Sequence, residues 1–326
     1  MFDRLDPLDR RLLDEFQRDL PLVPRPFAAI GGALGMAEDE VIARLSHLQA
    51  RAMIARVGAT VRPNTAGAST LAAMAVPAAR IEEVAAIVGA EPGVNHSYLR
   101  EDGWNLWFVA TAPDAAALDA VLARIGRATG LRVLDLRLVR PFNIDLGFRL
   151  AGARAMPAPR PLAADALDGS DRPLLQALTA GLALVPRPFA ALAESLGREE
   201  AEVIARIAEL SQAGILTRVG VIVRHRAVGW SANAMVVWAL PEDRIAAAGA
   251  ALARHPGITL CYQRRTVPGV WDYPLYSMIH ARSRAEALAV LAGAAALPEL
   301  AGATHRALFS TRCFKQTGAL LKADAA

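Results

Sequence analysis

The sequence predicts an α+β protein built as a tandem repeat, in which each copy joins a winged helix-turn-helix to a ferredoxin-like sheet. Leu-Val-Pro-Arg-Pro-Phe-Ala occurs at residues 22–28 and again at 184–190, and Arg-Val-Gly follows at the same offset, at 56–58 and 218–220. Within each copy, helical periodicity gives way to short β-branched runs in the same order. The chain is therefore a fused duplication.

Three helices are predicted at the start of each copy. Leucines at helical spacing indicate the first, and a stiff Pro-Arg-Pro turn separates it from two shorter ones. Three helices with a tight turn before the third form a helix-turn-helix. The expected helices cover residues 9–19, 27–34 and 38–50 in the first copy, and 171–180, 189–196 and 199–212 in the second.

In the rest of each copy, the pattern of apolar and β-branched residues predicts one wing strand and then the order β-α-β-β-α-β. This is the order of a ferredoxin-like sheet. In the first copy we expect strands at 54–61, 71–76, 94–100, 105–110 and 133–139, with helices at 78–89 and 115–125. In the second copy we expect strands at 216–223, 234–240, 258–264, 273–280 and 303–310, with helices at 242–255 and 284–292.

Composition shifts suggest the domain limits. We expect helix-turn-helix domains at 1–60 and 167–222, sheet domains at 61–151 and 223–326, and a linker rich in Pro and Ala at 152–166. The two copies are expected to pair through their sheets within one chain. A homodimer of this pseudo-dimeric chain is also expected.

Composition favours a cytoplasmic protein. Hydrophobic residues make up 54% of the chain, but no apolar run approaches the roughly 20 residues that span a bilayer, so no membrane partner is expected. Only Cys261 and Cys313 are present, which suits a reducing compartment and excludes a disulfide framework. The net charge of +4 is a weak indication of an anionic partner.

A helix-turn-helix followed by such a sheet resembles the leucine-responsive (Lrp/AsnC) regulators, so DNA binding is one candidate function. A reading helix needs basic and amide side chains at its N-terminal end. Here the third helix starts with acids, at residues 37–40 and 198–202, and these acids also suit a helix N-terminus. Arg44 and Arg206 are isolated bases. The acidic start of the third helix therefore disfavours tight DNA binding.

Several groups suited to proton transfer and to anion binding lie on one predicted strand of the first copy. His96, Tyr98 and Arg100 alternate, so their side chains share one face. Trp104 and Trp107 follow in the next hairpin and offer an aromatic surface. These residues could bind a ligand, or the tyrosine and arginine could form a structural cation–π contact.

The second copy keeps part of this pattern. Tyr262 and Arg264 align with the tyrosine and arginine of the first copy, whereas Leu260 replaces the histidine. A different histidine, His225, stands between two arginines after the wing strand. Nearby cations discourage an imidazolium, so a neutral imidazole is available to a proton or a metal, although a histidine at a strand end is more often plain surface.

At this point the residues resemble a known family. Residues 62–77, Asn-His-Ser-Tyr-Leu-Arg-Glu from Asn95 and Asn-Leu-Trp-Phe from Asn105 are similar to the D-type subunit of siroheme decarboxylase. Residues 223–229, 232–238 and 309–315 are similar to its L-type subunit. The resemblance spans essentially the whole chain and implies a fused D–L enzyme with an Lrp/AsnC-like fold.

The resemblance implies a carboxy-lyase. It would remove the acetate carboxyls at C12 and C18 of siroheme, giving 12,18-didecarboxysiroheme and carbon dioxide in heme d1 biosynthesis, a tetrapyrrole (porphyrin) pathway of denitrification. Siroheme and monodecarboxysiroheme are then the expected ligands. No cofactor is expected, since the iron belongs to the substrate and the macrocycle can delocalise charge. An Lrp/AsnC-type transcriptional regulator and a tetrapyrrole sensor are the alternatives.

The implied site residues fall into two groups. We expect His96 to be a proton donor or orienting base, His225 to be the second such group or an axial ligand to the substrate iron, and Tyr98 and Tyr262 to orient the acid group. Cations and aromatic rings suit an octacarboxylate macrocycle. The expected substrate-binding residues are Arg100, Arg264, Trp104 and Trp107, with Arg56, Arg218 and Lys315 as weaker candidates.

Overall fold

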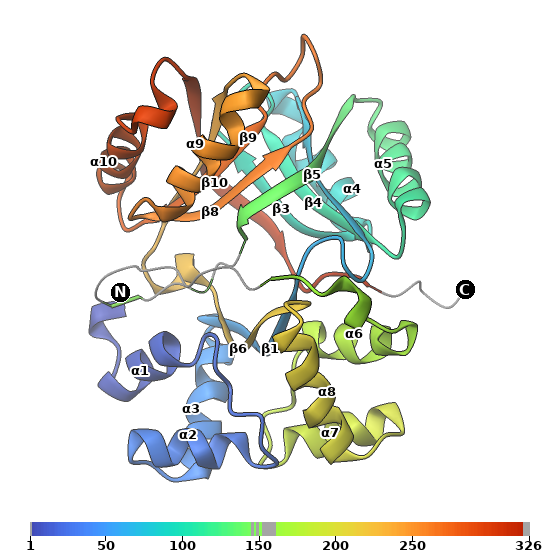
Figure 1. The fold of residues 1–326 in the computed structure, drawn as a ribbon, viewed down its shortest axis with the longest axis vertical. Coiled ribbons are helices and arrows are strands. Elements are labelled where there is room, and N and C mark those ends of the chain that lie inside the picture. Colours follow the sequence, from blue (N-terminus) through green and yellow to red (C-terminus); the bar gives the residue numbers. More distant parts are fainter. Residues whose placement is uncertain (1, 145–146, 148–149, 152–160, 322–326) are drawn as a thin grey trace. The chain divides into compact units, whose positions relative to one another are not determined.

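The computed structural model describes residues 2–144, 147, 150–151 and 161–321. The chain divides into two compact units, Met1–Ala66 with Gly147–Gly229, and Gly67–Leu146 with Trp230–Ala326. The first unit therefore unites the two helix-turn-helix motifs, and the second unites the two sheets (Figure 1). Most of the predicted linker, residues 152–160, lies outside the described residues.

The first unit holds two copies of one helical motif, each followed by a wing strand. The first copy contributes η1 (Phe2–Arg4), α1 (Pro7–Glu15), α2 (Pro26–Leu34), α3 (Glu38–Ala50) and β1 (Ile54–Val61). The second contributes η3 (Ala164–Ala166), η4 (Gly169–Asp171), α6 (Arg172–Ala180), α7 (Pro188–Leu196), α8 (Glu200–Gln212), β6 (Leu216–Val223) and η5 (His225–Val228).

The repeated string begins the second helix of each motif. Pro26 and Pro188 occupy the first turn of α2 and α7, where a missing N–H leaves no intrahelical bond unmade. Each helix ends at a glycine in the left-handed conformation, Gly35 or Gly197. The same two signals therefore set the bounds of both helices.

The wings of the two motifs pair with each other. β1 and β6 run antiparallel, with Gly58 opposite Gly220. A Cβ atom on Gly58 would lie 2.5 Å from the carbonyl oxygen of Leu178, and one on Gly220 would lie 2.5 Å from that of Phe16. The repeated Arg-Val-Gly therefore leaves room for the C-terminal ends of α6 and α1 against the ribbon.

The second unit is a closed barrel with the strand order β10-β3-β4-β2-β5-β8-β9-β7. The first copy supplies β2 (Ala68–Met74), η2 (Ala78–Arg80), α4 (Ile81–Ala90), β3 (Val94–Arg100), β4 (Leu106–Ala112), α5 (Ala115–Thr129) and β5 (Val133–Asn143). The second supplies β7 (Ala232–Ala239), α9 (Glu242–Arg254), β8 (Ile258–Arg264), β9 (Leu275–Ala281), α10 (Arg284–Ala295), η6 (Pro298–Leu300) and β10 (Thr304–Gln316).

The last strand of each copy closes the barrel by crossing to the other copy. β5 pairs with β2 of its own copy and then with β8, while β10 pairs with β7 and then with β3. Phe142, near the end of β5, packs against the second copy's core, and Phe314, near the end of β10, packs against the first copy's core. The expected pairing of the two sheets within one chain is confirmed.

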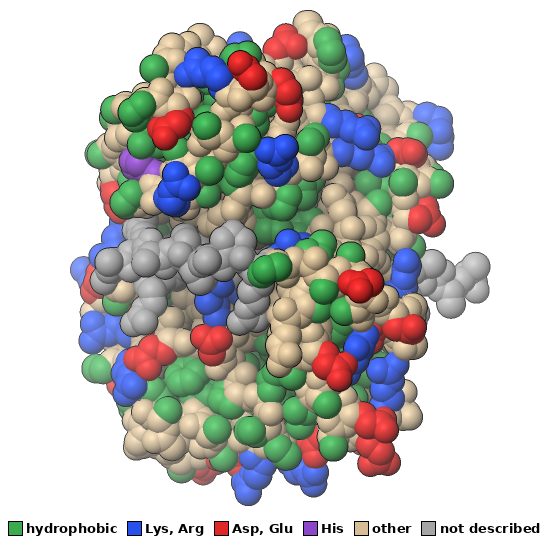
Figure 2. All heavy atoms as spheres, in the orientation of Figure 1, with side chains coloured by type: hydrophobic (Ala, Val, Ile, Leu, Met, Phe, Trp, Pro, Cys, Tyr) green, Lys and Arg blue, Asp and Glu red, His purple; other side chains and the backbone are tan. Residues whose placement is uncertain are grey.

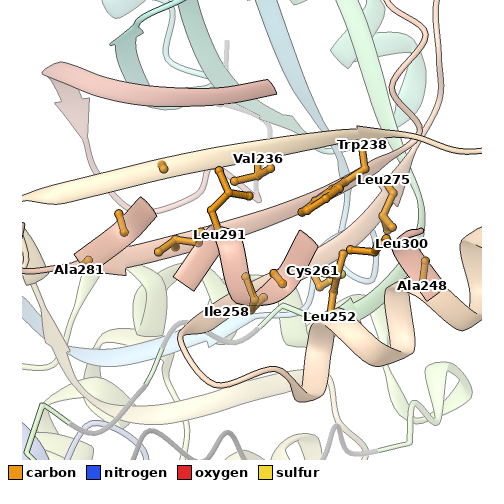
Figure 3. Packing of buried hydrophobic residues seen from close by; sticks show 14 of the residues in the cluster. Val236, Trp238, Ala248, Leu252, Ile258, Cys261, Leu275, Ala281, Leu291 and Leu300 are labelled. Carbon is orange, nitrogen blue, oxygen red and sulfur yellow. The ribbon is translucent and has the colours of Figure 1, made fainter. Parts of the chain in front are cut away.

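Separate apolar clusters stabilise the barrel from outside and inside. In the second copy, Leu252 of α9 and Leu291 of α10 pack with Trp238 of β7 on the outer face (Figure 3). The buried indole N–H of Trp238 donates to Ser277 Oγ at 3.0 Å. A further cluster draws side chains from both copies, among them Leu71 and Met235, and fills the interior.

Several predicted element bounds are wrong, and three of them have their cause in pairing with the other copy. The first helix ends at Glu15 rather than at residue 19, because Phe16 and Leu20 exchange backbone hydrogen bonds with Val221 and Val219 of β6. The last strands of the two copies continue to residues 143 and 316 rather than ending at 139 and 310, because each gains a second partner strand from the other copy.

Adjacent glycines in α2 test the packing of the helix-turn-helix. A Cβ on Gly31 would lie 2.5 Å from the carbonyl oxygen of Met36, whereas one on Gly32 would meet no atom within 4 Å. We expect Gly31→Ala to lower the free energy of unfolding by about 1–3 kcal/mol. Gly32→Ala should raise it by about 0.5–1 kcal/mol, because alanine is the better helix former. Urea denaturation measures both, and equal effects would contradict this packing.

Candidate functional site

The third helix of each motif uses its charges within the motif. Arg25 binds Glu38, and Arg187 binds Glu200, so acids in the first turns of α3 and α8 hold the Pro-Arg-Pro turns. These acids also suit the positive end of the helix dipole.

The isolated bases of these helices are engaged as well. Arg44 forms ion pairs with Asp6, Asp9 and Glu40. Arg206 binds Asp171, whose side chain is buried. On the face shown in Figure 2, basic and acidic side chains are interspersed over the helices of this unit. A track of cations for phosphates, which DNA binding requires, is not formed by the arginines of α3 and α8.

The three polar residues predicted to share a face of β3 do so. Tyr98 lies opposite Trp107 and His96 opposite Val109 on β4, and these partners belong to the interior cluster. Cross-strand partners point to the same side of a sheet, so His96 and Tyr98 face the inside of the barrel. The two rings stack with centroids 6.4 Å apart. The same-face prediction is confirmed, while the chemical roles stay predictions.

Asn95 fixes the orientation of His96. His96 Nδ1 lies 2.5 Å from Asn95 Oδ1, and the ring is only partly buried. The second copy has Leu260 at the equivalent position, so an imidazole on the first copy's side corresponds to a leucine on the second's.

The tyrosine and arginine pair has the same structural contacts in both copies. Arg100 lies 5.6 Å from the ring centre of Tyr98, and Arg264 lies 4.6 Å from that of Tyr262. Arg100 donates to the carbonyl oxygen of Leu308 at 3.1 Å.

Arg264 makes the equivalent bond, to Leu136 at 2.8 Å. Burial lowers the pKa of Arg264, and the nearby Tyr262 and Tyr276 partly offset this. Each arginine therefore joins its own copy to the last strand of the other. The cation–π contact that the sequence analysis gave as the structural alternative is present in both copies. Substrate binding by these arginines stays a prediction.

The predicted aromatic surface lies mostly in the packed interior. Trp107 is 1% exposed, its indole N–H donates to the carbonyl oxygen of Trp104 at 2.5 Å, and its ring meets that of Trp271 edge-on at 5.2 Å. Trp271 in turn donates to Tyr276 Oη at 2.7 Å. Trp104 is partly exposed and is thus better placed than Trp107 to meet a substrate.

Residues His225, Arg218 and Arg56 belong to the helix-turn-helix unit. His225 begins η5 and is 6% exposed, so the alternative of a plain surface histidine is wrong. Arg218 on β6 is also 6% exposed. Burial, followed by the charge of Arg218, lowers the pKa of Arg56 to about 10, which still leaves it protonated near neutral pH. Arg218 is thus a buried cation, Arg56 a partly buried one, and His225 a buried imidazole of this unit.

Lys315 has a structural role at the end of α4. Its ammonium donates to the carbonyl oxygens of Gly89 at 2.7 Å and Glu91 at 3.1 Å. A cation at this position satisfies carbonyls that the helix leaves unpaired. Burial lowers the pKa of Lys315. Its predicted contact with substrate stays a prediction.

His280 lies in a buried polar cluster that the sequence analysis did not identify. His280 Nδ1 lies 2.7 Å from Thr259 Oγ1, and Nε2 lies 2.9 Å from Asn233 Nδ2. His280 aligns with Thr111 of the first copy, and both are buried at the same place on equivalent strands. Comparing the copies along these strands is the signal that could have found this cluster.

Other kinds of site are not formed by the described residues. Within residues 2–144, 147, 150–151 and 161–321, no three or more His, Cys, Asp or Glu side chains gather to hold a metal ion. In the same part of the chain, no helix has both the length and the apolar character needed to cross a membrane. Cys261 is buried, which raises the pKa of its thiol, and Cys313 is exposed.

Comparison with known proteins identifies families and relatives that this chain is similar to. A family profile described as the AsnC-like ligand binding domain matches residues 66–142 and 227–315, and one described as the siroheme decarboxylase NirDL-like HTH domain matches 9–54 and 171–216. The siroheme decarboxylase NirDL subunit of Paracoccus denitrificans is 67% identical over 323 residues, which cover 99% of both chains.

Two further proteins illustrate the relationship. The siroheme decarboxylase NirD subunit of Stutzerimonas stutzeri is 51% identical over 45% of this chain and 96% of its own. A crystal structure of siroheme decarboxylase NirDL, in co-complex with an iron-uroporphyrin III analogue, is 27% identical and aligns with a TM-score of 0.66 over 96% of this chain and 92% of its own. On the full-length identity and the family-specific helix-turn-helix of both copies, this chain belongs to the siroheme decarboxylase family.

Proposed function

We propose that this chain is a carboxy-lyase that removes the C12 and C18 acetate carboxyls of siroheme, giving 12,18-didecarboxysiroheme and two molecules of carbon dioxide in heme d1 biosynthesis. The observation that carries the proposal is His96, a partly buried imidazole beside Tyr98 on the inner face of the barrel, in a chain with a full-length siroheme decarboxylase relative. The crystal structure with an iron-uroporphyrin III analogue supports a tetrapyrrole as the class of ligand.

Each decarboxylation needs an electron sink and a proton. When the bond between the carboxylate carbon and the methylene breaks, its electron pair stays on a carbon attached to the macrocycle, which can delocalise the charge. Carbon dioxide leaves, and one proton must reach the methylene to give a methyl group. Histidine suits this transfer because its ordinary pKa lies near neutral pH. The substrate is its own electron sink, so we propose that no cofactor is needed.

Within the barrel unit, we assign the proton transfer to His96. Its Nδ1 is bonded to Asn95, so Nε2 is the nitrogen that would carry the proton to the substrate. Tyr98 would orient the acetate, and Arg100 would add positive charge near it. Trp104 would contact the macrocycle.

The helix-turn-helix unit supplies the other proposed residues. His225 would act as the second proton-transfer group or as an axial ligand to the substrate iron. Arg56 and Arg218 would bind carboxylates of the substrate rim, because buried cations interact strongly with anions. A homodimer of the whole chain and a cytoplasmic location are also part of the proposal.

Anaerobic incubation with siroheme, followed by liquid chromatography and mass spectrometry, tests the proposal. Loss of the mass of one and then two carbon dioxide molecules is expected. A bound but unchanged tetrapyrrole would instead identify a sensor or carrier.

Replacing either histidine should affect turnover far more than stability. We expect His96→Gln and His225→Gln each to lower kcat by at least about 100-fold, since a positioned proton donor contributes that much or more. Thermal unfolding should change little for His96→Gln, whose ring is partly exposed. Wild-type rates in both variants would rule out the assignment, and His47→Gln, on helix α3, is the control.

The fate of the intermediate distinguishes two divisions of labour. If each histidine mainly serves one acetate, one variant should accumulate monodecarboxysiroheme, because only the second step is slowed. If both serve a shared reaction, both steps should slow equally. Time courses of the three masses for each variant separate these outcomes.

A further inference from the structure

The orientation of Asn95 is determined by its neighbours. Asn95 is 3% exposed, and its Nδ2 lies 3.4 Å from Thr111 Oγ1. That hydroxyl donates to the carbonyl oxygen of Gly93 at 3.4 Å and accepts the backbone N–H of Leu320 at 3.1 Å. A hydroxyl has only one hydrogen, so Thr111 accepts from the Asn95 amide. The amide oxygen must then face His96 Nδ1, at 2.5 Å.

This arrangement determines which nitrogen of His96 carries the fixed proton. An amide oxygen can only accept, so Nδ1 keeps its hydrogen whether the ring is neutral or charged. The proton that the ring gains and loses is then on Nε2. We propose that Asn95 is the positioning residue of the proton donor His96, an inference that rests on the decarboxylase function proposed above.

The second copy holds Asn95 in place. β10 pairs with β3 so that Gln316 lies opposite His96. The backbone N–H of Thr317 donates to the carbonyl oxygen of Asn95 at 2.8 Å, and its hydroxyl contacts the same oxygen at 3.3 Å. Together with the bond from Leu320 to Thr111, these contacts run from the end of the second copy to the histidine of the first. A first copy alone would lack them.

The chain contains a matched position without the histidine. Thr259 occupies the place of Asn95, and Leu260 that of His96. The last strand of the other copy also reaches this position, because Asn143 Nδ2 donates to the carbonyl oxygen of Thr259 at 2.9 Å. The Thr259 side chain bonds to His280 instead. The anchoring is therefore shared by both copies, whereas the coupling to a proton donor belongs to the first.

Three variants separate positioning from stability. Asn95→Leu keeps the volume and removes the acceptor, Asn95→Asp replaces it with a carboxylate, and Thr259→Val disturbs the matched position of the second copy. We expect Asn95→Leu to lower kcat by about 10- to 100-fold with little change in KM, as misplaced catalytic groups do. Thr259→Val should lower the Tm and leave kcat within about twofold.

Asn95→Asp should shift the pH profile rather than abolish activity. A carboxylate beside an imidazolium favours the charged form, so it raises the pKa of His96. A step that needs protonated His96 is lost as pH rises through that pKa, so the alkaline limb of kcat/KM should move up by about one pH unit. On β3, the titratable and charged groups on this face are Tyr98, whose ring stacks on His96, and Arg100, which lies over Tyr98. On the partner strands, the neutral residues Val109 of β4 and Gln316 of β10 lie opposite His96, and the ammonium of Lys315 is bound at the end of α4.

Nitrogen-15 NMR of histidine-labelled protein gives a readout that does not depend on turnover. His96 is assigned by its absence in His96→Gln, and its neutral ring is expected as the Nδ1–H tautomer in the wild type and in Thr259→Val, but not in Asn95→Leu. An Nε2–H tautomer in the wild type, or unchanged kcat and pH profile in both Asn95 variants, would overturn the inference. Failure of the wild type to decarboxylate siroheme with the expected tautomer intact would instead contradict the proposed function.

Discussion

The fold of the barrel unit depends on backbone hydrogen bonding at the edges of its two sheets. A ferredoxin-like sheet alone leaves unpaired N–H and C=O groups along β3 and β8, and such edges are prone to aggregation. Here β10 pairs with β3, and β5 pairs with β8. The last strand of each copy therefore supplies hydrogen-bond partners for the backbone groups at the sheet edge of the other copy. The aromatic interior, the cross-copy bonds of Arg100 and Arg264 and the contacts at Asn95 all depend on this exchange.

The same exchange limits where the copies can diverge. One pair of positions that joins the copies stays alike: each copy keeps a Tyr and Arg pair whose arginine bonds a carbonyl on the other copy's last strand. Positions that face inward between these joints differ, as with His96 and Leu260, or Thr111 and His280. The link between β3 and β4 covers residues 101–105, whereas that between β8 and β9 covers 265–274 and brings Trp271 into the interior. The two copies can therefore carry different functional side chains while they keep the same backbone fold.

Local signals in the sequence were sufficient for most elements. The β-branched runs predicted at 54–61 and 216–223, and the strands at 94–100 and 258–264, agree with β1, β6, β3 and β8. Alternation also predicted that His96 and Tyr98 share a face.

Features that depend on the other copy were not predictable in this way. Pro141 has no backbone N–H, and the segment from Ser310 to Gln316 is polar apart from Cys313 and Phe314, so neither resembles the inside of a strand. β5 and β10 nevertheless continue through them because a partner strand from the other copy is present. The sequence predicts that Trp107 is part of an aromatic surface, but in the folded barrel its side chain is buried. The burial of His225 is likewise a property of tertiary packing, since its own neighbours in sequence are charged.

Covalent fusion of the two copies has a consequence for assembly stoichiometry. Because β5 and β10 must be exchanged, a first copy needs one second copy, and pairing of two like copies would give a barrel with two His96 positions or with none. Joining the copies in one chain makes the mixed pairing an intramolecular event with a high effective concentration. Equal amounts of the two halves, and their correct choice of partner, are thereby set when the chain is translated rather than by regulation of two separate chains.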